Sequence, residues 1–229
     1  MGSGTIQLLS RGKQDGFLIG NPQMTHFRKV FKRHTPFAIE HQEILFDNMP
    51  EFGGKSVATM PLVADAVTHC YMRIQLPAMM YNGSSVSWLN HSAYALIKKV
   101  SVEIGGCVID EYTGNELHVM HQLTTKESKK EGMMAMTGEY VYYSQMVQNK
   151  GPLTLYLPLP FWFSRDASQA LPLCALRNQE VTISVTLHEL EEMFDPTILK
   201  NTPYFQPDTT VEVTQCQLFG HFITLGKEE

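Results

Sequence analysis

The segment Leu155–Leu176, LYLPLPFWFSRDASQALPLCAL, decides how this chain can fold. Its leucines at every second position alternate with Tyr156, Pro158 and Pro160, which is the period of a β-strand. Because proline donates no backbone hydrogen bond, the strand is predicted to lie at a sheet edge or to end there. The aromatic run Phe161, Trp162 and Phe163 follows, and each such ring buries roughly 150–250 Å² in a core. The segment therefore predicts a strand that leads into an aromatic corner.

The chain after this corner returns to the sandwich. Arg165–Asp166 is predicted to turn the chain, and Ala170–Leu176 supplies further apolar residues. The stretch Val181–Leu190, VTISVTLHEL, then alternates apolar and polar side chains as a half-buried strand does.

Similar alternation occurs elsewhere. Cys70–Leu76 is predicted as a strand, and the stretch Val100–Ile104 is predicted as another that ends at the turn Gly105–Gly106. Near the C-terminus, the apolar positions change phase between Val213 and Cys216, which predicts a β-bulge near Thr214–Gln215. Two less regular stretches, Phe37–Asp47 and Lys55–Val63, have an extended composition.

Helix signals are sparse. Thr113–Glu116 has the form of a capping box, and apolar residues at helical spacing follow it, so one short helix is predicted there. Lys126–Met136 is charged, then rich in Met and Gly, and is predicted to be an exposed loop. Many short strands separated by Pro and Gly turns favour an all-β, antiparallel sandwich with one or two short helices between strands.

Composition limits the classes of function. The chain has 229 residues and a formal charge of −5, which argues against a protein that chiefly neutralises nucleic acid. The four cysteines show no metal-ligand spacing and are expected to be reduced thiols.

Candidate catalytic and metal motifs are incomplete. Gly53–Ser56 resembles the end of a phosphate loop but lacks its first glycine and its helix, so a turn before a strand is predicted. In His188–Glu192 the second histidine of a zinc-protease motif is replaced by glutamate. His69 and Cys70 are adjacent in a strand and therefore point to opposite faces. We expect no catalytic site, no metal site and no cofactor.

One pair of histidines has a spacing that suits a metal site. His118 and His121 could share one face of the short helix and bind a metal. An exposed helix face is the favoured interpretation, because no cysteine and no obvious third ligand lies nearby in the sequence.

Two surface features are singled out. Arg28, Lys29, Lys32 and Arg33 form a basic cluster in a mildly acidic chain, which indicates either contact with an acidic partner or a solvated strand edge protected by charge. Asn82 and Asn90 each begin a glycosylation sequon, which matters only if the chain meets a glycosylation machinery.

Four stretches resemble the major capsid proteins of nucleocytoplasmic large DNA viruses. They are Ile6–Glu40, which contains GNPQMTHF and RHTPF, Leu96–Thr124, which contains IGGCVID, the opening segment with PLPFWF and ALPL, and NQEVTISVTL after it. They occur in the order found in that family, and their combination is more specific than any single motif.

The resemblance implies a fold and a role. It implies an eight-stranded jelly-roll sandwich at residues 37–229, preceded by an N-terminal arm at residues 1–36, while the second jelly roll of the family is absent from this sequence. It implies a structural protein of the virion capsid that is assembled in the host cytoplasm. Partners would be further copies in a trimeric capsomer, neighbouring capsomers and minor capsid proteins.

Further implications concern the inner face of the shell. By this resemblance, Arg28, Lys29, Lys32 and Arg33 face minor capsid proteins or the internal membrane, and no sequence-specific nucleic-acid binding is expected. Two other functions stay open: a lone jelly roll that recognises a glycan or receptor through its loops, and a jelly-roll enzyme with a metal held by scattered histidines.

Overall fold

The structure is a computed structural model that describes residues 37–81, 84–140, 152–176, 178–193 and 211–226. Contacts divide the chain into two units, Ala38–Thr224 and a smaller one that combines Met1–Phe37 with Leu225–Glu229. Nearly all of the described residues belong to the larger unit. The predicted N-terminal arm, residues 1–36, lies outside the described residues.

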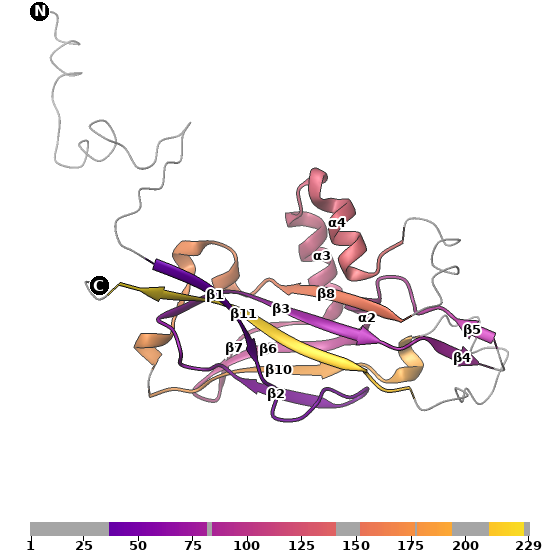
Figure 1. Cartoon of the computed structure of the whole chain (residues 1–229), viewed down its shortest axis with the longest axis horizontal. Coiled ribbons are helices and arrows are strands. Elements are labelled where there is room, and N and C mark those ends of the chain that lie inside the picture. Colours follow the sequence, from indigo (N-terminus) through magenta and orange to yellow (C-terminus); the bar gives the residue numbers. More distant parts are fainter. Residues whose placement is uncertain (1–36, 82–83, 141–151, 177, 194–210, 227–229) are drawn as a thin grey trace, which may run out of the picture. The chain divides into compact units, whose positions relative to one another are not determined.

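β-strands make up most of the regular secondary structure of the larger unit, which also has a few short helices (Figure 1). The strands are β1 Phe37–Ile44, β2 Lys55–Thr59, β3 Ala66–Leu76, β4 Met79–Tyr81, β5 Ser84–Val86, β6 Ile97–Ile104, β7 Cys107–Tyr112, β8 Leu153–Leu159, β9 Leu171–Pro172, β10 Val181–Leu187 and β11 Gln215–Leu225. The α-helices are α2 Ser92–Leu96, α3 Gly114–Thr124 and α4 Glu127–Thr137, and the 3-10 turns are η2 Trp162–Ser164, η3 Ala167–Gln169, η4 Leu173–Leu176 and η5 Leu190–Met193.

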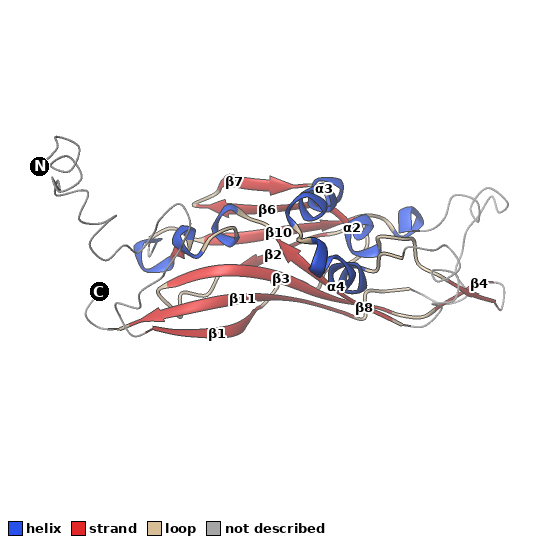
Figure 2. Cartoon of the chain, turned by 90° about the horizontal axis from the view of Figure 1, so that it is seen from above, coloured by secondary structure: helices blue, strands red, loops and turns tan. Residues whose placement is uncertain are grey.

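The strands form two facing sheets. One has the order β1-β11-β3-β8, with β9 also paired to β3, and the other has the order β2-β10-β6-β7 (Figure 2). β1, the first of these strands, pairs with β11, the last, and β2 pairs with β10. Further inwards, β3 pairs with β8 and β9, and β6 pairs with β7. Wrapping one long antiparallel hairpin into a sandwich gives this nested order, which is that of a jelly roll. The predicted all-β, antiparallel sandwich is confirmed, while the short β4-β5 ribbon was not predicted.

Alternate residues of the strands fill the space between the sheets. Met72 and Ile74 of β3 are completely buried, as are Ile183 and Val185 of β10 from the opposite sheet, and all belong to one hydrophobic core. The predicted strand at Cys70–Leu76 is therefore confirmed with its predicted inner face.

The β-bulge lies on a different strand from the predicted one. β11 begins at Gln215, and its pairing with β3 is regular until Gly220 faces Cys70, after which Phe222 faces Val67. The extra residue therefore belongs to β3, whose buried phase changes between Val67 and Cys70. The phase change near Thr214 marks the start of β11 instead.

Two other predictions of local structure were wrong. Lys126–Met136 was predicted to be a loop, yet Glu127–Thr137 forms helix α4, which ends at Gly138 with φ 72°. Its Glu, Lys, Met and Ala residues are strong helix formers, and its mostly exposed side chains explain the polar composition. The strand predicted to reach Leu190 ends at Leu187, because the chain turns into η5. In contrast, the capping box formed by Thr113 and Glu116 is confirmed at the start of α3.

The aromatic corner joins β8 to the opposite sheet. Phe161 and Phe163 are completely buried with ring centroids 5.6 Å apart, while Trp162 is only partly buried and packs edge-on against Phe163. The backbone N–H of Trp162 donates to Asp110 Oδ2 of β7 at 3.1 Å. The two phenylalanines thus supply most of the apolar burial at this corner.

The charged pair in the middle of the segment also has local partners. Arg165 Nη2 donates to the hydroxyl of Tyr112 at 2.8 Å, which ties the corner to β7. Asp166 Oδ1 accepts from the backbone N–H of Ser168 at 3.1 Å and so caps η3.

Truncating the corner tests its contribution. We expect Phe163→Ala to lower the free energy of unfolding by about 3–5 kcal/mol, because it leaves a cavity in the core. Trp162→Ala is the matched control and should cost less, since part of that side chain already contacts solvent. Urea unfolding of both variants measures the difference. A Phe163→Ala variant that unfolds at the same urea concentration as the parent would contradict this role of the corner.

Candidate assembly surface

The outer face of the β1-β11-β3-β8 sheet carries aromatic side chains. Tyr71 and Phe219 face each other across β3 and β11, and their rings stack with centroids 5.2 Å apart. The ring centroid of His221 lies 3.9 Å from that of His41 and 6.0 Å from that of Tyr71. Tyr156 of β8 lies opposite Arg73 on this same face and is 37% exposed. We call His41, Tyr71, Tyr156, Phe219 and His221 the aromatic sheet face.

The protonation state of His221 affects the charge of this face. Burial and the nearby His41 and His69 lower the pKa of His221 below its ordinary value, so its imidazole is neutral at pH 7. Outer faces of solvated antiparallel sheets usually carry polar side chains. Aromatic residues are enriched where one protein surface contacts another. The composition of this face therefore favours a contact surface.

A hollow opens beside the aromatic sheet face at the β8 edge. Helix α4 packs against β8 and contributes Met136 to this hollow. Its other lining residues include His69, Tyr71, His121, Tyr156 and His221.

Two further places expose apolar side chains. β7 is the last strand of its sheet, and its Val108 and Ile109 are 52% and 55% exposed. On α3, Val119 and Leu123 are 56% and 78% exposed and lie one helical turn apart. Exposed apolar groups at a sheet edge and on a helix are candidates for burial in an assembly.

Five of the residues proposed from the sequence lie outside the described residues: Arg28, Lys29, Lys32, Arg33 and Asn82. Asn90 is partly buried, and its Nδ2 donates to the carbonyl of Tyr140 at 3.1 Å while its Oδ1 accepts from the N–H of Tyr140 at 2.7 Å. Glycosylation of Asn90, which stays a prediction, would modify the same Nδ2 that donates to Tyr140. Within the described residues no helix has the length and apolar character needed to span a bilayer.

The two histidines of α3 have different surroundings. His121 is buried, and its Nδ1 hydrogen-bonds the hydroxyl of Tyr94 at 3.0 Å. Burial, with a smaller contribution from His118, lowers the pKa of His121 to about 4, so this side chain is a neutral core residue. The prediction of an exposed helix face is therefore wrong for His121.

Three other motifs named in the sequence also have defined positions in the structure. Cys70 is buried and His69 is exposed, as their opposite faces predict, and burial raises the pKa of the Cys70 thiol to about 12. All four cysteines are free thiols. Gly53 lies in a turn just before β2, as predicted for Gly53–Ser56. His188 lies beyond β10, and its ring contacts the carboxylate of Glu192.

Comparison with known proteins identifies the fold. Residues 25–225 match the family model described as the major capsid protein N-terminus. The chain belongs to this family. The resemblance noted in the sequence is thereby confirmed.

The aromatic sheet face was not predicted from the sequence. The signal that could have revealed it is an aromatic residue at an outward position in each of three strands, namely Tyr71, Tyr156 and Phe219.

Curated capsid proteins are similar over most of this chain. Identity is 36% over 203 residues with "Probable capsid protein 4" of Acanthamoeba polyphaga mimivirus, which covers 85% of this chain and 39% of that protein. It is 34% over 219 residues with the major capsid protein of Phaeocystis pouchetii virus, which covers 84% of this chain and 42% of that protein. The chain thus spans about two fifths of the length of these capsid proteins.

Solved structures share the same fold. A quasi-atomic model of the PBCV-1 virus capsid superposes with a TM-score of 0.70 at 22% identity, covering 89% of this chain and 46% of that chain. The Faustovirus major capsid protein superposes with a TM-score of 0.65 at 13% identity, covering 96% and 59%. These likenesses show that the capsid family's jelly-roll fold is present here.

Proposed function

We propose that this chain is a jelly-roll building block of the icosahedral capsid of a large DNA virus. It acts by self-association into trimeric capsomers and not by catalysis. The observation that carries the proposal is membership of the capsid family over residues 25–225. Neighbouring capsomers are its further partners, the virion capsid is its location, and the host cytoplasm is the place of assembly.

The aromatic sheet face is the part of the surface best suited to a contact between chains. It presents stacked aromatic rings and a neutral His221, groups that cost little to desolvate.

A charge placed on the aromatic sheet face tests this contact. We expect Tyr156→Glu to weaken self-association at least tenfold, because the interface would have to desolvate a carboxylate. Ser128→Glu adds the same charge on the exposed surface of α4 and is the matched control. Sedimentation of the parent and both variants over a concentration series measures association.

Three outcomes of that comparison are decisive. Loss of the trimer in Tyr156→Glu and its retention in Ser128→Glu supports the proposal. Equal association of Tyr156→Glu and the parent would contradict a contact through this face. A parent that stays at 25.9 kDa over the whole series would contradict self-association of this chain.

The basic cluster is proposed to contact an acidic inner surface of the virion. Arg28, Lys29, Lys32 and Arg33 place four positive charges within six positions of a chain whose net charge is −5. Each Lys or Arg near an anionic bilayer contributes about 1 kcal/mol of attraction at moderate salt. The internal membrane and acidic minor capsid proteins are therefore the partners that this cluster fits.

Charge reversal tests the basic cluster. We expect the parent to co-sediment with phosphatidylserine-containing vesicles and not with purely phosphatidylcholine vesicles, and binding to fall with salt. The variant R28E/K29E/K32E/R33E should lose binding while it keeps the melting temperature of the parent. If the parent does not co-sediment with anionic vesicles, membrane contact by this cluster is refuted.

A further inference from the structure

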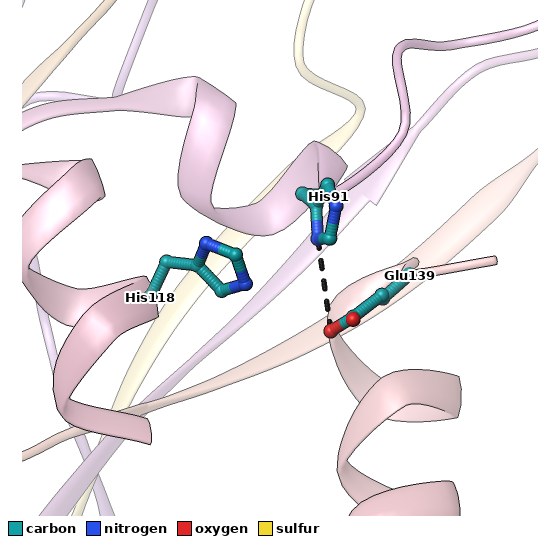
Figure 3. Close-up of side chains that lie close together, drawn as sticks. All are labelled: His91, His118 and Glu139. Carbon is teal, nitrogen blue, oxygen red and sulfur yellow. Dashed lines mark ion pairs between the residues drawn. The ribbon is translucent and has the colours of Figure 1, made fainter. Parts of the chain in front are cut away.

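Three side chains from separate parts of the chain meet beside α3. His91 directly precedes α2, His118 lies in the middle of α3, and Glu139 follows the end of α4 (Figure 3). The imidazole rings of His91 and His118 are 4.6 Å apart between centroids. One potential ligand atom from each of the three side chains lies within 4.8 Å of the other two. All three side chains are partly buried.

The distance between His91 and Glu139 suits two ligands of one metal better than a direct hydrogen bond. His91 Nδ1 lies 3.6 Å from Glu139 Oε2, whereas N–H···O hydrogen bonds span about 2.7–3.2 Å. In a tetrahedral zinc site with bonds of about 2.0–2.2 Å, neighbouring ligand atoms are about 3.3–3.6 Å apart. His91 Nδ1 is also shielded from solvent and has no hydrogen-bond partner among the described residues.

Gln122 brings a fourth side chain to the same place. Its Nε2 lies 3.4 Å from His118 Nε2 and 3.3 Å and 3.4 Å from the two oxygens of Glu139. Rotation of the amide by 180° exchanges the nitrogen and the oxygen, which occupy nearly the same space. After that rotation, Gln122 Oε1 would be a neutral oxygen ligand at the fourth corner.

The backbone holds these side chains in place. His91 has φ 59° and is the only non-glycine residue with positive φ in the described part of the chain. Its N–H donates both to Asn90 Oδ1 at 3.0 Å and to the carbonyl of Gly138 at 3.1 Å, which joins the turn before α2 to the end of α4. The positive φ therefore belongs to a turn whose hydrogen bonds fix the position of His91 relative to Glu139.

Helix α3 is held equally closely. A Cβ at Gly114 would lie 2.1 Å from the carbonyl oxygen of Tyr94 and 2.5 Å from that of Ile97. Only glycine allows this approach of α3 to α2 and the start of β6. His118, one turn further along α3, is thereby brought to His91.

We propose that His91, His118 and Glu139 bind a divalent transition-metal ion, with Zn²⁺ as the first candidate and Gln122 or water as the fourth ligand. Two imidazoles and one carboxylate are an established zinc ligand set, and imidazole also suits Cu²⁺ and Ni²⁺. The ion would join α2, α3 and the end of α4, and so fasten the helical pair to the sandwich. This proposal is independent of the proposed capsid role.

Titration of the metal-stripped 229-residue chain with zinc chloride alone tests the site. Calorimetry should give one saturable Zn²⁺ per chain. At a hundredfold excess of zinc over Kd, the melting temperature should rise by about 5–10 °C, because the ion binds only the folded state. Absence of saturable binding by the parent would overturn the proposal.

Three variants separate this site from other histidines. His118→Gln and the nearly isosteric Glu139→Gln should each weaken zinc binding at least tenfold, while their melting temperatures without metal report whether the fold is kept. His221→Gln is the matched control, since His221 lies in a separate group with His41 and His69 on the aromatic sheet face. Zinc binding that is lost in His221→Gln and kept in both other variants would place the ion elsewhere and refute this assignment.

Discussion

The apolar contact between the inner faces of the two sheets is the interaction on which the rest of the structure depends. Met72 and Ile74 from one sheet and Ile183 and Val185 from the other are withdrawn completely from water. Fully burying such a side chain contributes about 1.5–3 kcal/mol, and the nested strand order brings residues from both ends of the larger unit into one core. Every later feature, including the aromatic corner and the positions of α3 and α4, is attached to this sandwich.

Because the inner faces of the two sheets already pack against each other, the outer faces of the sandwich are available for other contacts. In this chain the outer side of the β1-β11-β3-β8 sheet carries stacked Tyr71 and Phe219 beside a neutral His221, where a solvated sheet would carry mainly polar groups. The β7 edge and α3 add exposed aliphatic side chains. The fold and the exposed apolar surface are therefore both consistent with a capsid protein, the family to which residues 25–225 belong. Membership of that family establishes the jelly roll, and the surface indicates which parts of it are available for assembly.

Much of the sandwich could be predicted from the sequence, because a half-buried strand marks itself by alternation, as Cys70–Leu76 does, and a capping box marks the start of α3. Helix α4 was missed because its side chains are mostly exposed and gave no apolar period, although its residues favour helix. The predicted bulge near Thr214 is wrong because the change of phase there marks the start of β11, whereas the extra residue lies in the partner strand β3. The histidine group was missed for a different reason: His91, His118 and Glu139 are far apart in the sequence and meet only through the turn before α2 and the close approach at Gly114.

The central claim is that this jelly roll builds capsomers from copies of itself. Negative-stain electron microscopy of the purified chain, with class averages computed without imposed symmetry, tests it most directly. We expect compact particles with three-fold symmetry, because each copy would bury its aromatic sheet face against its neighbour. Averages that contain only single domains at the highest concentration studied, or particles without a three-fold axis, would contradict it.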